Sequence, residues 1–123
     1  MGNPVAHFEV SGEDPGKLRD YYARLFGWEF DTNSPVAPSV SEAGKYGFMT
    51  SDAGIPGGIG GGPGYPSHAI FHVGVDDVAA ALVNAERLGG TRVPGPEKNP
   101  NGQLVVAHSR APDGNLIGLA GPR

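Results

Sequence analysis

The chain contains an internal repeat. Residues 7–28, HFEVSGEDPGKLRDYYARLFGW, recur 63 positions later as residues 70–91, IFHVGVDDVAAALVNAERLGGT. Each segment has the pattern of a strand, a capped helix and a glycine stop. The positions that are identical between the two copies are Phe8, Val10, Asp14, Arg24, Leu25 and Gly27, which return as Phe71, Val73, Asp77, Arg87, Leu88 and Gly90. The repeat predicts two copies of one module, with any binding site where the copies face each other.

The first copy has the signals of a βαβββ module. Residues 5–10 alternate as a strand does, which puts His7 and Glu9 on one face and Phe8 on the other. Asp14-Pro15 is an N-cap followed by a first-turn proline, and Gly27 supplies a left-handed stop. Further strands are expected at 28–30, near 45–50 and at 57–60, with glycine-rich sequence over 54–66.

The second copy repeats this order in fewer residues. A strand at 68–75 precedes a helix capped by Asp76 or Asp77 and ended by Gly89-Gly90. Three strands follow, at 91–93, 104–108 and 115–119, and the last of them matches the first copy at an offset of 58. We therefore expect an α+β fold in one domain, residues 1–123, made of two modules at about 4–62 and 67–121.

Composition excludes several classes of partner. The net charge of -4 comes from 13 acidic and 9 basic residues that are scattered along the chain, so nucleic acid and anionic membrane surfaces are not expected partners. There is no cysteine, hence no disulfide and no thiolate metal site. No signal peptide and no apolar run long enough to span a bilayer is visible, which indicates a soluble, cytoplasmic protein.

Several motifs together resemble the vicinal oxygen chelate superfamily, which includes glyoxalase I, extradiol dioxygenases and the bleomycin resistance proteins. The motifs are HFEV, DPGKLRDYYARLFGW, HVGVDD, AERLGG and APDGNLIGL, and they cover almost the whole chain in the family's order. The resemblance implies two βαβββ modules forming a cupped mixed sheet. It implies little about activity, because this fold hosts unrelated functions.

In metal-using members of that superfamily, each module gives one ligand from its first strand and one, usually a carboxylate, from its last. The corresponding positions here are His7, Gly60, Ile70 and Gly118, and only His7 can bind a metal. A cation with one protein ligand would not stay bound. The resemblance therefore implies no metal at the standard site, and we expect no cofactor.

An alternative site remains open. Glu9 and His72 are repeat partners two residues beyond the first-strand ligand positions, so they face the same way as His7 and Ile70. Together, His7, Glu9 and His72 would form a set of two histidines and one carboxylate, which suits iron or zinc. The same three side chains are the candidate catalytic residues if the site does acid–base chemistry. Otherwise they are polar groups of a ligand cavity.

The aromatic residues divide into two groups. Phe8, Tyr21, Tyr22, Phe26 and Phe71 are expected in the core under the helices. The others suit the wall of a cleft for a flat, partly apolar ligand. The full set of expected ligand-binding residues is His7, Glu9, Trp28, Phe30, Tyr46, Phe48, Ile59, Tyr65, Ile70, His72 and His108, whereas His68 is placed outside the site.

Three functional classes follow from these observations. The first is a metal-free binding protein of the bleomycin-resistance type, a homodimer that sequesters an aromatic or polycyclic natural product and so confers antibiotic resistance. The second is a lyase, isomerase or dioxygenase that uses His7, Glu9 and His72 to hold a divalent metal or to transfer protons. The third is an accessory protein without a small ligand, which the polar inner strand faces disfavour.

Overall fold

The computed structural model describes residues 2–33, 36, 40–50, 54–93, 97–98 and 104–123. The sequence also predicts loops at 31–39 (DTNSPVAPS) and 94–102 (PGPEKNPNG), and both lie largely outside these residues. Contacts divide the chain into two compact units, which we call the N-terminal unit (residues 7–69) and the C-terminal unit (residues 1–6 and 70–123). Each unit has the expected order of one strand, one helix and a set of further strands, so the predicted α+β class is confirmed.

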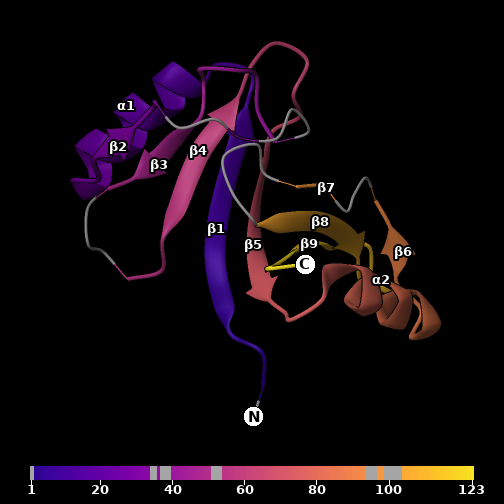
Figure 1. Ribbon diagram of the computed structural model, residues 1–123. Helices are drawn as coiled ribbons and strands as arrows, with labels where there is room; N and C mark the ends of the chain where they lie inside the picture. Colours follow the sequence, from indigo (N-terminus) through magenta and orange to yellow (C-terminus); the bar gives the residue numbers. More distant parts are fainter. Residues whose placement is uncertain (1, 34–35, 37–39, 51–53, 94–96, 99–103) are drawn as a thin grey trace. The chain divides into compact units, whose positions relative to one another are not determined.

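The sheet of the N-terminal unit is mixed. Strand β1 (Val5–Gly12) is followed by helix α1 (Pro15–Phe26). Three short strands complete the module: β2 (Phe30–Asp31), β3 (Gly47–Met49) and β4 (Gly57–Gly61). Their spatial order is β2-β3-β4-β1, in which β1 and β4 run parallel and the other pairs are antiparallel (Figure 1).

The C-terminal unit repeats this arrangement with one extra strand. Its elements are β5 (His68–Gly74), α2 (Val78–Arg87), β6 (Thr91–Arg92), β7 (Glu97–Lys98), β8 (Val105–Arg110) and β9 (Leu116–Gly121). The order is β5-β9-β8-β6, with β7 also paired to β8. As in the first unit, only the first and last strands of the module run parallel. The sequence did not predict β7.

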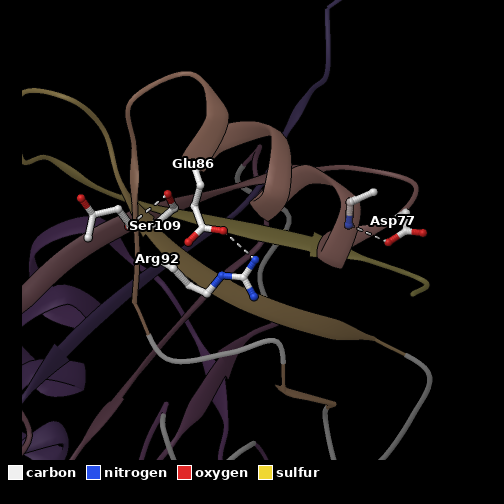
Figure 2. A network of polar contacts seen from close by, with 6 residues as sticks. Asp77, Glu86, Arg92 and Ser109 are labelled. Carbon is white, nitrogen blue, oxygen red and sulfur yellow. Dashed lines mark hydrogen bonds and ion pairs between the residues drawn. The ribbon is translucent and has the colours of Figure 1, made fainter.

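Both helices begin at the expected aspartates. Asp14 accepts a hydrogen bond from the Lys17 backbone N–H at 3.1 Å, and Asp77 accepts one from that of Ala80 at 3.0 Å (Figure 2). Gly27 ends α1 in the left-handed region, at φ 73°, where a residue without Cβ is unstrained. An ion pair of 2.9 Å between Glu86 and Arg92 then links the end of α2 to β6 (Figure 2).

The core of the C-terminal unit lies between α2 and one face of its sheet. Val78 and Leu82 of α2 are fully buried against Ala107 of β8, and Leu119 of β9 packs on the same cluster. Because side chains alternate along a strand, the residues next to Ala107 and Leu119 belong to the opposite face. This parity places His108 and Gly118 on the face that α2 does not cover.

The aromatic residues of the N-terminal unit form a cluster on the α1 side. The ring of Trp28 lies 5.4 Å from that of Phe8, 5.9 Å from Tyr22 and 5.1 Å from Phe26, measured between centroids. The expectation that all the helix aromatics are core was wrong for Tyr21 and Phe26, which are 57% and 54% exposed. Phe71 of β5, also expected in the core, is 42% exposed.

Strand register corrects the alignment of the two copies. Glu9 of β1 lies opposite Gly58 of β4, and its repeat partner His72 of β5 lies opposite Gly118 of β9. The last strands therefore correspond at an offset of 60, because Gly118 is the counterpart of Gly58 and not of Gly60. The offset of 58 read from the sequence was wrong by two residues, which leaves the facing of each side chain unchanged.

Neither of the helices in the described parts of the chain has the length and apolar character that crossing a membrane requires.

Candidate functional site

Polar side chains of the N-terminal unit gather on the sheet face opposite α1, which we call the N-terminal open face. Adding a Cβ at Gly12 or Gly47 would bring it against α1 side chains, which identifies the face that the helix covers. The alternate positions of β1, which are His7, Glu9 and Ser11, point the other way. Glu9 and Ser11 are buried there, and His7 is half-buried.

Tyr46 covers two glycines of β4 on this face. A Cβ at Gly58 would lie 2.2 Å from the Tyr46 hydroxyl oxygen, and one at Gly60 would lie 2.5 Å from the ring carbon Cδ2. Tyr46 is only 2% exposed, and its ring meets that of Phe48 edge-on at 4.8 Å. On the other face, the ring of Phe8 lies equally close over Gly57. The glycine run is therefore a buried strand on which aromatic rings pack directly against the backbone.

The Glu9 carboxyl is the most perturbed acid of the N-terminal open face. Burial raises its pKa to about 8, so it is mostly protonated at pH 7. Burial also raises the pKa of the Tyr46 hydroxyl, and the Glu9 charge raises it further. Burial lowers the pKa of His7, which favours the neutral imidazole. At neutral pH this face thus carries polar groups that are largely uncharged.

The C-terminal unit places two histidines over a glycine. Gly118 of β9 lies opposite His72 of β5 on one side and opposite His108 of β8 on the other. The two imidazole rings are 5.6 Å apart between centroids, at an interplanar angle of 57°. A Cβ at Gly118 would lie 2.3 Å from Cδ2 of His72. Only glycine at 118 allows the buried His72 ring to lie in this position.

These contacts bear on the superfamily's standard metal site. The sequence alignment put Gly60 and Gly118 at the two last-strand ligand positions, whereas strand register makes Gly58 the counterpart of Gly118 and Ala120 the counterpart of Gly60. None of these four residues has a side chain that can bind a metal, and Ile70 at one of the first-strand positions is a buried apolar residue. The space that a carboxylate side chain would need is filled by the Tyr46 ring at Gly60 and by the His72 ring at Gly118. The residues present do not fit a metal at that site.

The residues expected to line a cleft belong partly to the N-terminal unit and partly to the C-terminal unit. His7, Glu9, Tyr46 and Phe48 belong to the N-terminal open face. In the C-terminal unit, Ile70, His72 and His108 share the face opposite α2, by strand parity. The remaining four lie elsewhere: Trp28, Phe30 and Ile59 are on the α1 side, and Tyr65 is in a turn where its N–H donates to the Gly62 carbonyl at 3.0 Å.

Two buried serines of the N-terminal unit were not anticipated. Ser11 follows Glu9 by two residues, so strand parity alone would have added it to the open face. Ser41 comes from the loop before β3, and its hydroxyl accepts a hydrogen bond from the Gly61 N–H at 2.8 Å. No pattern in the sequence connects Ser41 to β4, because the contact joins residues 20 positions apart.

Comparison with known proteins identifies the family. The Glyoxalase/Bleomycin resistance protein/Dioxygenase superfamily profile matches residues 5–119, so the chain belongs to this superfamily, as its motifs predicted. No curated protein matches the sequence.

Solved structures support the same fold. A hypothetical protein, BH1468 from Bacillus halodurans C-125, aligns at a TM-score of 0.71 with 14% identity, over 98% of this chain and 95% of that one. Methylmalonyl-CoA epimerase from Streptomyces coelicolor, in complex with 2-nitronate-propionyl-CoA, aligns at 0.67 with 15% identity over 98% of both chains. A superfamily member from Vibrio splendidus 12B01 aligns at 0.60 with 14% identity, over 98% and 99%. Identities this low establish the fold alone.

The packing of His72 on Gly118 can be tested by a double-mutant cycle. Gly118→Ala should lower the free energy of unfolding by about 1–3 kcal/mol, because the new methyl group overlaps the His72 ring. The same substitution in a His72→Ala background should cost clearly less. Gly2→Ala, where a Cβ meets nothing within 4 Å, is the control. Chemical denaturation of wild type, Gly118→Ala, His72→Ala and the double variant measures the coupling energy. Additive effects of the two substitutions would show that the ring does not rest on this glycine.

The burial of Glu9 should appear in the pH dependence of stability. The folded protein holds this proton up to about pH 8, whereas the unfolded chain releases it near pH 4.5, so stability falls as pH rises between these values. The slope is about 1.4 kcal/mol per pH unit. The variant Glu9→Gln lacks the titrating group and so lacks this slope. Its free energy of unfolding should therefore increase relative to that of wild type by a few kcal/mol between pH 5 and pH 8.

Urea denaturation at several pH values measures this difference. Glu13→Gln, which changes an exposed carboxylate of the same unit, is the matched control and should follow the wild-type curve. A Glu9→Gln curve parallel to wild type across the range would mean that the Glu9 carboxyl is hydrated and ionised in the folded protein.

Proposed function

We propose that this chain binds a small, partly aromatic organic molecule, in the manner of the resistance proteins of its superfamily, and uses no metal at the superfamily's standard site. The observation that carries this proposal is the filling of the last-strand ligand positions by the rings of Tyr46 and His72. A protein that has replaced both carboxylates by packed rings has lost the group on which metal-dependent members rely. The outcome would be sequestration of the ligand.

The N-terminal open face suggests the chemistry of that ligand. Phe48 is half-buried beside Tyr46, and its ring can contribute a contact to an aromatic group. Glu9, mostly protonated at pH 7, can donate one hydrogen bond and accept others. Because Trp28 and Phe30 lie on the α1 side, the aromatic wall is smaller than the sequence suggested. A ligand of one or two rings with a hydrogen-bonding substituent fits this face better than a large polycyclic compound.

An enzyme is the second candidate, and Glu9 is the observation that favours it. A buried carboxyl with a pKa of about 8 is suited to acid–base catalysis near neutral pH. Methylmalonyl-CoA epimerase, whose fold this chain shares, shows that the scaffold can hold an isomerase. Under this alternative, Glu9 would transfer a proton to or from a carbon or oxygen of the ligand, and the reaction would be an isomerisation or elimination.

One experiment separates the two candidates. Wild-type protein is screened by equilibrium dialysis against a panel of small phenols, planar aromatic acids and bleomycin, with mass spectrometry of the recovered compound. Phe48→Ala should weaken binding of any hit by about tenfold, which corresponds to the loss of one or two aromatic contacts. Phe71→Ala, which removes an exposed ring from β5, is the control and should bind as wild type.

The chemical state of the recovered compound decides the function. For a binding protein, the compound should be unchanged after long incubation with either wild type or Glu9→Gln. A product formed by wild type and not by Glu9→Gln would establish an enzyme. Equal binding by wild type and Phe48→Ala would exclude the N-terminal open face as the binding surface.

We also propose that the protein is a homodimer. Helix α1 exposes three large apolar side chains, Tyr21, Leu25 and Phe26, on a unit too small to bury them itself.

Light scattering at micromolar concentration should give twice the mass of one 12.7 kDa chain. Leu25→Glu should shift the protein to monomers. The matched control is Leu88→Glu, at a similarly exposed leucine after α2. A wild-type mass of one chain would refute the dimer.

A further inference from the structure

We propose that His72 and His108 form a binding site for a divalent transition metal in the C-terminal unit, with ligands that do not stand at the superfamily's standard ligand positions. This inference goes beyond the proposed organic ligand and does not depend on it. It also differs from the alternative set read from the sequence, because it pairs His72 with His108 and not with His7. The three adjacent strands β5, β9 and β8 carry the site, so it is positioned by the sheet of one unit.

Strand register places the two imidazoles side by side. His72 and His108 flank the same glycine, Gly118, from the two neighbouring strands and project from the same face. One ring nitrogen of each histidine lies within 4.8 Å of a ring nitrogen of the other. Gly118 has no side chain between them. The two imidazoles therefore lie next to each other on one face of the sheet, and the ring of His72 occupies the space over Gly118 that a larger residue at 118 would need.

The spacing of the rings is close to that of two histidines bound to one ion. A zinc–nitrogen bond of about 2.0–2.1 Å and a tetrahedral angle put the two nitrogens about 3.4 Å apart and the ring centroids about 5 Å apart. The observed centroid separation is 5.6 Å. Small rotations about the side-chain torsions would close the remaining difference, and they need no movement of the strands.

The surroundings favour a cation that prefers neutral nitrogen ligands. Imidazole suits zinc, copper and nickel, whereas magnesium and calcium prefer oxygen. His72 is 2% exposed, so water competes poorly for its nitrogen, while the half-buried His108 leaves one side of the site open. Two protein ligands leave the other coordination positions to water or to oxygen atoms of a bound compound. Such a site should take up and release metal more readily than a four-ligand structural site.

Metal titration of chelator-treated protein tests the proposal. Zn²⁺ measured by calorimetry should bind at one equivalent per chain, and Co²⁺ should develop visible absorption bands of a nitrogen-coordinated ion. His72→Gln and His108→Gln should each weaken Zn²⁺ binding at least tenfold. His68→Gln, on the same strand as His72, is the matched control and should bind as wild type. Binding should weaken at acid pH, because protons compete with the metal for the imidazole nitrogens.

Two results would overturn the proposal. The first is that wild type binds Zn²⁺ no more tightly than His108→Gln does, while circular dichroism shows that both proteins are folded. The other is binding that persists in His108→Gln and is lost in His7→Ala, which would assign the metal to the set of His7, Glu9 and His72. If His72→Gln does not fold, the comparison of wild type with His108→Gln tests the proposal by itself, because His108 is only half-buried. Organic ligands are screened without metal, so failure of either proposal leaves the other testable.

Discussion

Direct contact between aromatic rings and glycine backbone is the constraint on which both units depend. Tyr46 lies on Gly58 and Gly60, Phe8 lies on Gly57 from the other side, and His72 lies on Gly118. At each contact the strand residue is glycine, and a ring from elsewhere in the same unit occupies the space that a side chain would take. This packing explains three of the four glycines of β4, whereas Gly61 has a φ of 119° and its Cβ would meet the backbone of Gly12.

The same packing sets the electrostatics of the N-terminal unit. Glycines at 58 and 60 bring Tyr46 close to the backbone, and the buried ring shares its surroundings with Glu9. Water is excluded from the carboxyl, so its pKa rises to about 8. An acid held neutral in this way costs stability at high pH, which is a cost typical of sites kept for binding or catalysis.

Local signals in the sequence predicted most of the fold but only part of the site. Caps at Asp14 and Asp77 and the strand periodicity located both helices and nearly all strands, because these signals act within a few residues. The place of Trp28 in the aromatic cluster on the α1 side depends on contacts with Phe8 and Tyr22 that no short-range pattern encodes. His108 stood as one candidate among many until register placed it beside His72.

The ring over Gly118 also constrains how this chain can change during evolution. A substitution at 118 that restores a carboxylate meets the His72 ring, so it is disfavoured unless position 72 has first lost its ring. The two positions are therefore epistatic, and the order of substitutions matters. A chain with a carboxylate at 118 is reached from the present one most easily through an intermediate that has neither the carboxylate nor the histidine, so two substitutions in a fixed order are needed.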